Sequence, residues 1–405
     1  MSTPNPLDRL LEPAEATAII RAHTSLLPTE RAPLIDLAGR VLMEDLISDE
    51  DQPPFAAATM DGFAVVSGDT DPLRRIVGDQ FAGTMEALHV EPGTAAYITT
   101  GAPLPPGADA VVQIERTEQT PDGVRIGEAA RAGQNIRPVG SDLKRGDRVL
   151  AAGTVLTPAA VGLLASLGRT NALVTRRPRV SVLATGDELV EPGQPLGPGQ
   201  IRDSNRFALV TALAPLGVTI QYAGLAPDTD AAQRAFLLAR IADSDVIITS
   251  GGVSMGRKDL IKGLLVELAT VHFRQVRMRP GKPFTFATAE QTLLFGLPGN
   301  PVSGLVGFEV FVRPALLAMQ GHQQTDRPRA RVRLAHAVTP IDRIDYLRVT
   351  LRRADDGILD AASTGPQQSS RLASFIGADA LAIIPPRATP YAAGEMVDAL
   401  LLNPV

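Results

Sequence analysis

The sequence predicts an α/β multidomain fold, in which a central, parallel, doubly wound α/β domain accompanies a β-rich insert, a mixed N-terminal domain and a small C-terminal β domain. Two observations support this prediction. In residues 179–327, strand-like runs alternate with helix-like runs, which is typical of a parallel sheet with helices on both faces. Residues 51–139 and 328–405 instead contain short β-like runs separated by Gly, Pro and Asp turns, which is typical of small β domains.

The N-terminal domain is predicted to combine residues 1–50 with residues 140–178, because both stretches have mixed character and the β-rich insert, residues 51–139, separates them. Proline suits the first turn of a helix, and Pro13 opens such a pattern. The expected helices of this domain span residues 13–25 and 158–167, and the expected strands of the insert span 62–66, 95–99, 110–114 and 123–126.

The α/β domain, residues 179–327, is predicted from apolar runs that each precede a longer helical pattern. In such sheets ligands bind beyond the carboxyl ends of the strands. The predicted strands span 179–184, 218–224, 245–250 and 293–297, and the helices 204–216, 229–242, 259–268 and 301–319; the strands of the C-terminal domain, residues 328–405, span 330–335, 346–352, 380–384 and 396–402.

Composition excludes several classes of site. The formal net charge is −5, whereas a protein that binds nucleic acid in bulk needs a basic face. The chain has no cysteine, so disulfides, thiolate metal sites and cysteine nucleophiles are excluded. Its five histidines lie far apart, so we do not expect a histidine zinc site. No apolar run approaches the about 18 residues of a membrane helix, and no secretory signal is visible. We therefore expect a cytoplasmic protein without a membrane or nucleic-acid partner.

Glycine-rich polar loops follow three of the predicted strands, at residues 184–189, 250–256 and 296–303. Glycine lets the backbone approach a ligand closely, and a helix N-terminus directly afterwards favours an anion. One such loop would be an ordinary tight turn, but three in one sheet predict a ligand that carries phosphate. Neither the P-loop pattern nor the dinucleotide fingerprint is present, so a kinase or a dehydrogenase is disfavoured.

A cationic stretch at residues 277–283 places Pro280 and Gly281 between Arg279 and Lys282. The simpler interpretation is a solvated basic loop. Prolines fix the backbone, however, and a fixed bend could direct both cations at one anion.

Carboxylates add a third feature. The carboxylates are Asp187, Glu188, Asp228 and Asp259. Each alone would be a surface acid or a helix cap. Beside loops that bind phosphate, however, they indicate a Mg²⁺ site and metal-assisted attack on a phosphoanhydride.

Several motifs occur in one order along the whole chain: residues 53–55, 60–64, 100–103, 135–137, 185–189, 203–205, 250–256, 280–283 and 296–303. In this combination the chain resembles the molybdopterin molybdenumtransferases, the family that includes the E domain of gephyrin. The resemblance implies a homodimer of four-domain subunits. It also implies adenylylated molybdopterin and molybdate as substrates, molybdenum cofactor and AMP as products, and Mg²⁺ as the assisting metal.

The resemblance also implies roles for individual residues. The implied catalytic residues are Asp61, Thr100, Asp142, Glu188, Asp228 and Asp259, of which Glu188, Asp228 and Asp259 would hold Mg²⁺. The implied ligands of the pterin nucleotide are Arg137, Thr185, Gly186, Asp187, Ser250, Gly251, Gly252, Ser254, Pro298, Gly299 and Asn300. The implied molybdate ligands are Arg279, Lys282, Ser303, Arg348 and Ser369. Asp61, Thr100, Arg137 and Asp142 would come from the partner subunit's insert.

The chain departs from the family pattern at two cations. Gln275 stands where the family has lysine, and Arg279 stands where lysine is commoner. Arginine keeps the charge but changes the geometry of the donors. A missing cation at position 275 would weaken anion binding or shift the selectivity between molybdate and tungstate.

Two alternatives stay open at this point. The α/β domain also resembles molybdopterin adenylyltransferases and related nucleotide hydrolases, although a single-domain enzyme would not need the two flanking parts. A catalytically silent scaffold is the other alternative, although lost chemistry predicts loss of the acids, which are all present. We also expect transient contact with the adenylyltransferase and with molybdoenzymes.

Overall fold

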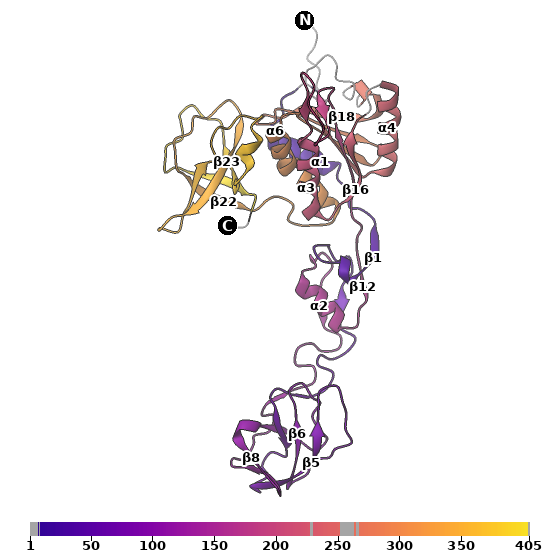
Figure 1. The fold of residues 1–405 in the computed structure, drawn as a ribbon, viewed down its shortest axis with the longest axis vertical. Coiled ribbons are helices and arrows are strands. Elements are labelled where there is room, and N and C mark those ends of the chain that lie inside the picture. The colour runs from indigo at the N-terminus through magenta and orange to yellow at the C-terminus, as the bar shows by residue number, and fades with distance from the viewer. Residues whose placement is uncertain (1–6, 8, 227–229, 252–262, 265–266, 404–405) are drawn as a thin grey trace. The chain divides into compact units, whose positions relative to one another are not determined.

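The computed structural model describes residues 7, 9–226, 230–251, 263–264 and 267–403 (Figure 1). The chain divides into two compact units. One contains residues 1–31, 39–41 and 173–405, and the other contains residues 32–38 and 42–172. The four domains expected from the sequence divide the chain more finely than these units, and that division stays a prediction.

The first unit is built on a six-stranded sheet with the strand order β16-β13-β17-β21-β20-β18. The first four strands are parallel, whereas β20 and β18 each run antiparallel to the preceding neighbour. The sheet is therefore mixed at one edge, because two residues connect β20 to β21 and a parallel pair would need a crossover of a dozen or more. The strands are β13 (Arg179–Ala184), β16 (Thr219–Leu225), β17 (Val246–Ser250), β18 (Thr270–Gln275), β20 (Pro283–Ala289) and β21 (Thr292–Leu297).

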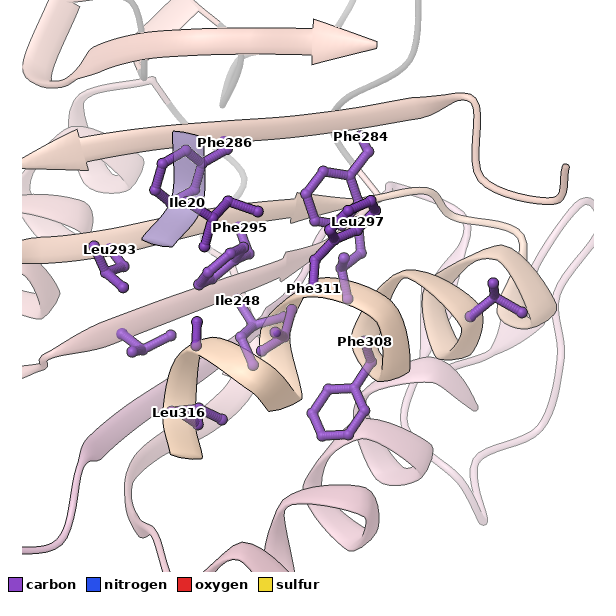
Figure 2. Packing of buried hydrophobic residues seen from close by; sticks show 14 of the residues in the cluster. Ile20, Ile248, Phe284, Phe286, Leu293, Phe295, Leu297, Phe308, Phe311 and Leu316 are labelled. Atoms are coloured by element: carbon purple, nitrogen blue, oxygen red, sulfur yellow. The ribbon is translucent and has the colours of Figure 1, made fainter. Parts of the chain in front are cut away.

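Helices cover both faces of this sheet, because successive strand residues point to opposite sides. Val182 and Ile248 belong to a core shared with α1 (Pro13–Ala22), α3 (Asn205–Leu213) and the long helix that follows β21. Their neighbours in the strands, such as Leu183 and Ile247, pack with α4 (Asp230–Asp243) on the other face. Figure 2 shows the first of these cores, in which Phe311 of the long helix packs against Phe284 of the sheet, with ring centroids 4.7 Å apart. The helix expected at 259–268 lies largely outside the described residues.

The long helix runs from Pro301 to Met319, as predicted, with a wider π-helical turn in its middle. By length and composition its 19 residues, with a mean hydropathy of 1.6 over the most apolar 18, would suffice to cross a membrane, contrary to our expectation that no such run exists. However, 72% of its most apolar stretch is buried inside the protein, as expected of a helix that is apolar on most sides. Its segments are α6 (Pro301–Gly307), η5 (Phe308–Val312) and α7 (Arg313–Met319).

The C-terminal strands of the first unit form a small closed barrel. The order β23-β24-β22-β26-β25 closes through a further pairing of β23 with β25. One short strand, β19 (Met278–Arg279), comes from the α/β part and adds to this sheet by pairing in parallel with the start of β23. The barrel strands are β22 (Arg329–Leu334), β23 (Ile344–Arg353), β24 (Leu359–Ser363), β25 (Ala380–Ile384) and β26 (Met396–Leu401).

The second unit contains a six-stranded sheet with the order β7-β4-β6-β5-β9-β8. The four strands predicted here are present, and β5 and β8 were missed because their sequences are polar and break the alternation. The sheet strands are β4 (Gly62–Val65), β5 (Leu73–Gln80), β6 (Thr94–Ile98), β7 (Ala110–Gln113), β8 (Thr117–Thr120) and β9 (Gly123–Ile126). Further elements of this unit include α2 (Pro158–Ser166), the short 3₁₀ helices η2 (Leu34–Asp36) and η3 (Ile114–Arg116), and the two-stranded pairs of β3 (Ala57–Ala58) with β10 (Ile136–Arg137) and of β2 (Leu46–Ile47) with β11 (Arg148–Leu150).

Two histidines that are distant in the sequence meet in the fold, so our expectation that all five lie apart is wrong for this pair. The ring centroids of His23 and His272 lie 3.9 Å apart beside Phe286, because the end of α1 packs against the sheet edge. Burial lowers the pKa of His272, and His23 adds to this effect. In the described part of the chain, no group of three or more His, Asp or Glu residues could hold a metal.

A buried ion pair stabilises the sheet at the end opposite the strand-end loops. The Asp245 carboxylate accepts bonds from both terminal nitrogens of Arg176, each at 2.6 Å, and from the Arg179 backbone N–H at 2.7 Å. Burial alone would raise the pKa of Asp245, but these bonds outweigh it and lower the pKa to about 2. The carboxylate therefore stabilises the folded state at every pH above its ordinary pKa of 3.8.

We predict that Asp245→Asn lowers the free energy of unfolding by about 2 kcal/mol at neutral pH, since one pKa unit corresponds to about 1.4 kcal/mol. The difference from the parent should shrink as the pH falls below about 4, because the parent carboxylate is then protonated on unfolding. Urea titrations at several pH values measure this. Asp243→Asn, which removes a more exposed carboxylate paired with Arg240, is the matched control and should change stability by less than about 1 kcal/mol. An equal loss in both variants would contradict the prediction.

Candidate functional site

The loops after three neighbouring strands, β13, β17 and β21, meet at one edge of the sheet. The Thr185 backbone N–H donates to the Ser250 carbonyl at 3.1 Å, and the Gly251 N–H donates to the Leu297 carbonyl at 3.0 Å. The structure therefore brings together the three loops that the sequence singled out.

Glycine is required where two of these loops touch. Gly251 has φ of +85°, and a Cβ there would lie 2.6 Å from the Thr185 carbonyl oxygen. A Cβ at Gly299 would lie 3.8 Å from the Cα of Gly251. The backbones of the three loops thus form a surface that a ligand can approach closely.

Asn205 links these loops with its side chain, although sequence reasoning gave it no role. Its Nδ2 donates to the Ser250 hydroxyl at 2.9 Å and to the Gly299 carbonyl at 2.7 Å. The side chain is set in place by the start of α3, where the buried Asp203 carboxylate pairs with Arg206 at 2.7 Å. The sequence feature that could have indicated a role for Asn205 is the motif at residues 203–205, whose polar residues begin a helix directly after a loop.

A pocket of about 610 Å³ lies where the loop after β21, the cationic bend (residues 277–283) and the C-terminal barrel meet. Four of the five predicted molybdate ligands line it, and Pro298 and Asn300 of the predicted nucleotide set line it as well. Among the residues that the structure describes, no aspartate or glutamate lines this pocket. Its wall consists of residues 278–283, Pro298, Asn300, Ser303, Arg343 and residues 366–369.

The cationic bend is fixed at both ends by backbone bonds. The Arg277 N–H donates to the Leu11 carbonyl at 2.7 Å, and the Val276 N–H donates to the Lys282 carbonyl at 2.9 Å. At its tip Gly281 has φ of +106°, and a Cβ there would lie 3.6 Å from the Ser303 carbonyl oxygen. The bend is therefore a defined structure beside the start of α6, and the simpler interpretation as a solvated loop does not hold.

The start of α6 forms a second wall of the pocket. Pro301 occupies the first helical turn as predicted, and Ser303 is buried in that turn. The Val302 N–H donates to the Ser369 carbonyl at 3.1 Å, which ties the loop at residues 366–369 to the helix. Pro301 has no N–H, and the Gly304 N–H donates to the Asn300 carbonyl at 3.1 Å. The dipole of the helix start is therefore the feature that favours an anion there.

A buried acid, Asp345, lies behind the cations. Its side chain is 2% exposed and pairs with Arg279, and this bond raises the pKa of Arg279. Arg348 is completely buried and does not line the pocket, unlike the other predicted molybdate ligands. Burial lowers the pKa of Arg348 to about 10, although Asp345 opposes the shift. In the described part of the chain the Arg348 Nη2 atom has no hydrogen-bond partner.

Gln367 attaches the loop at residues 366–369 to strand β23 of the barrel. Its Oε1 accepts from the Arg348 backbone N–H at 2.9 Å, and its Nε2 donates to the Arg348 carbonyl at 3.1 Å. The side chain thus pairs with β23 as a neighbouring strand would. The adjacent Gln368 and Ser369 are positioned in the pocket wall by this contact.

The four predicted site residues of the second unit form two pairs. The Asp61 carboxylate accepts from the Thr100 backbone N–H at 2.6 Å and from its hydroxyl at 2.8 Å, and these bonds lower the pKa of Asp61. Arg137 forms an ion pair with Asp142. Both pairs border one segment, since β3 pairs with β10 in the register Arg137↔Ala57, and the Gly101 N–H donates to the Ala58 carbonyl at 2.8 Å.

The predicted Mg²⁺ ligands are only partly described. Glu188 and its neighbours Gly186 and Asp187 are exposed on the loop after β13. Asp228 and Asp259 lie outside the described residues, as do Gly252 and Ser254 of the predicted nucleotide set. The magnesium site therefore stays a prediction.

Comparisons with known proteins agree over the whole chain. Residues 11–168 match the model described as MoeA N-terminal region (domain I and II), residues 181–318 match a probable molybdopterin binding domain, and residues 331–402 match MoeA C-terminal region (domain IV). The crystal structure of a molybdopterin biosynthesis MoeA protein from Pyrococcus horikoshii is similar, with a TM-score of 0.80, 31% identity and coverage of 98% of this chain and 100% of that one.

Curated relatives give the same result. Molybdopterin molybdenumtransferase from Haemophilus influenzae is 37% identical over 91% of this chain and 93% of its own length. Molybdopterin molybdenumtransferase 2 from Mycobacterium tuberculosis is 38% identical over 90% of this chain and 93% of its own. Gephyrin from Dictyostelium discoideum is 36% identical over 93% of this chain and 60% of its own. The chain therefore belongs to the molybdopterin molybdenumtransferase family.

Proposed function

We propose that this protein inserts molybdenum from molybdate into adenylylated molybdopterin and releases AMP, so that molybdenum cofactor is formed. The observation that carries the proposal is the pocket between the cationic bend, the start of α6 and the C-terminal barrel. Of the described residues, three basic side chains and no acid line this pocket, which adjoins the strand-end loops. An oxyanion and a phosphate-bearing ligand would thus lie side by side.

The chemistry of the pocket suits molybdate, which is a tetrahedral dianion. Arg279 and Lys282 supply positive charge, and the hydroxyls of Ser303 and Ser369 can donate hydrogen bonds. The helix start adds a favourable dipole. Water around the oxyanion is replaced by donors that the fold already holds in position.

The pterin nucleotide would lie along the strand-end loops, where backbone groups can approach its phosphates. Pro298 and Asn300 line the oxyanion pocket and also follow β21, so the two sites share a wall. This neighbourhood supports coupled chemistry. The oxyanion would be held beside the dithiolene until cleavage of the phosphoanhydride releases AMP.

We also propose Mg²⁺ as the metal that assists this cleavage. Carboxylate oxygens are the donors that Mg²⁺ prefers, and Glu188 is exposed where the nucleotide would bind. When bound, Mg²⁺ would neutralise charge that develops on the phosphate oxygens. The residues that would hold it are Glu188, Asp228 and Asp259.

A homodimer in the cytoplasm, with transient contact to the adenylyltransferase and to molybdoenzymes, completes the proposal. In such a dimer Asp61, Thr100, Arg137 and Asp142 would act from the partner subunit's insert. The two exposed pairs that they form suit this role, because exposed charged groups held by hydrogen bonds are available to a second surface.

The activity is tested by measuring AMP released from purified adenylylated molybdopterin, with and without molybdate and Mg²⁺, while the molybdenum bound to the pterin is counted. We expect AMP release that depends on molybdate, with one molybdenum transferred for each AMP. AMP release without metal transfer would instead indicate a nucleotide hydrolase, and adenylylation of molybdopterin from ATP would indicate an adenylyltransferase. Absence of any reaction would favour the scaffold.

Lys282→Ala should raise the molybdate concentration needed for half-maximal rate by about tenfold, because a charge-assisted contact to the oxyanion is lost. The KM for adenylylated molybdopterin should change little. Arg352→Ala, which removes an exposed cation elsewhere on β23, is the control and should leave both values unchanged. If Lys282→Ala has the molybdate dependence of the parent, Lys282 does not bind the oxyanion.

The shared site can be tested by mixing two impaired variants, Asp61→Asn and Lys282→Ala, at a molybdate concentration well below the parent's half-maximal value, where Lys282→Ala should keep only about a tenth of the parent rate. If Asp61 acts on the partner's pocket, each mixed dimer has one cleft with both residues intact. Random exchange of subunits should then restore about a quarter of the parent activity. If the two residues act within one subunit, no mixed cleft is intact, and the activity of the mixture stays at the mean of the two variants. Mixing Asp61→Asn with Asp142→Asn is the control, because both changes lie in the same unit and no cleft is restored.

A further inference from the structure

We infer that Gln80 is a positioning residue for Asp61 and Thr100, the pair that we propose acts on the partner subunit's pocket. This inference rests on the proposed function, and it adds a residue that acts through the pair rather than on the substrates. Gln80 is the last residue of β5 and is 2% exposed. Its side-chain amide closes the turn that follows the strand, and this turn holds the residue directly before Thr100.

The Gln80 side chain bonds to three backbone groups of residues 81–86. Its Nε2 donates to the Thr84 carbonyl at 2.7 Å and to the Phe81 carbonyl at 3.3 Å, and its Oε1 accepts from the Glu86 N–H at 3.2 Å. A buried amide is costly to leave without partners, and a turn that satisfies it is favoured over other conformations of the same residues. The turn is therefore held in one conformation by the side chain inside it.

This turn is bonded to Thr99, which lies directly after β6. The Ala82 N–H donates to the Thr99 hydroxyl at 3.2 Å, and the Thr99 N–H donates to the Gln80 carbonyl at 3.2 Å. Thr99 also begins a tight turn of its own, since its carbonyl accepts from the Ala102 N–H at 3.0 Å. Thr100 is the next residue in that tight turn, so its position depends on where Thr99 is held.

Thr100 holds the Asp61 carboxylate by one of its oxygens. The backbone N–H and the hydroxyl of Thr100 both donate to Oδ1, at 2.6 and 2.8 Å. Because both bonds end on the same oxygen, they fix the direction in which the other oxygen, Oδ2, points. A displacement of Thr100 would therefore turn the carboxylate, and a misplacement of about 1 Å can lower a rate about a hundredfold. The same bonds lower the pKa of Asp61, so this pKa reports on the pair without any substrate.

A second turn in the same sheet provides a matched control. Thr94 begins β6 and is 5% exposed, and its hydroxyl donates to the Glu91 carbonyl at 2.8 Å and accepts from the Glu91 N–H at 2.9 Å. Thr94 thus closes a turn as Gln80 does, but at the end of β6 that is opposite to Thr100. Thr94→Val should therefore lower stability without displacing the pair.

The test measures molybdate-dependent AMP release and the pKa of Asp61 in three variants. Gln80→Met keeps a side chain of similar length but removes its bonds, and Thr99→Val removes only the hydroxyl that accepts from the turn. We expect each to lower kcat about tenfold with little change in KM for either substrate, because the carboxylate is misdirected while the substrates still bind. The pKa of Asp61, followed by a carbon NMR titration, should rise towards its ordinary value of 3.8. Thr94→Val should keep both the kcat and the pKa of the parent.

Two results would overturn the role of Gln80 alone. One is an equal loss of kcat in Thr94→Val and Gln80→Met, which would mean that Gln80 contributes only to stability. The other is a parent-like kcat, or a parent-like pKa of Asp61, in both Gln80→Met and Thr99→Val. If Asp61→Asn has the kcat of the parent, Asp61 has no role in the reaction and Gln80 has nothing to position. Failure of the proposed function differs from all of these, since the parent itself would then release no AMP in response to molybdate. The titration would still test Gln80 in that case, because it needs no substrate.

Discussion

The pairing of β19 with β23 is the contact on which the candidate pocket depends. This pairing is two residues long and joins the cationic bend of the α/β part to the C-terminal barrel, with Arg279 opposite Asp345. A second tie, from the Val302 N–H to the Ser369 carbonyl, joins the barrel to the start of α6. The pocket wall is therefore shared by two separate sheets, and its shape is set by where these few backbone bonds hold them. The Asp345 carboxylate is buried at this joint and therefore needs a cation beside it. The strand pairing that sets the shape of the pocket thus also places the positive charge of Arg279 there.

Much of the α/β fold could be predicted from the sequence because buried parallel strands are continuous apolar runs. β13, β17 and β21 were found within a residue at each end, and so was the helix at 301–319. Two of the strands that were missed, β18 and β19, lack that signal. β18 is an edge strand with polar residues at several positions, and β19 is only two residues long. Its position depends on a partner strand 66 residues further along the chain, which no local pattern indicates.

The same limit applies to the candidate site. The glycine-rich loops could be predicted because a close approach of backbones requires glycine, and Gly251 shows such an approach. Asn205, Arg343 and Asp345 could not, since each is a polar residue whose surroundings are supplied by distant segments. Arg348 illustrates the converse. The resemblance implies that it contacts molybdate, yet in this structure it is buried behind the wall with one nitrogen unpaired.

The two departures from the family pattern at cationic positions have different consequences in this fold. Gln275 does not line the pocket, and its carbonyl accepts from the Leu11 N–H at 3.2 Å, so the absence of a lysine there leaves the cations of the wall unchanged. The arginine at position 279, where lysine is commoner in the family, forms an ion pair with the buried Asp345. A guanidinium can bond to the acid through one nitrogen and still present other donors to the pocket, whereas an ammonium is a compact charge with less reach. Arginine at position 279 thus keeps Asp345 paired and leaves donors for an oxyanion. Together with Lys282 and Arg343, it gives the pocket three cations despite the glutamine at position 275.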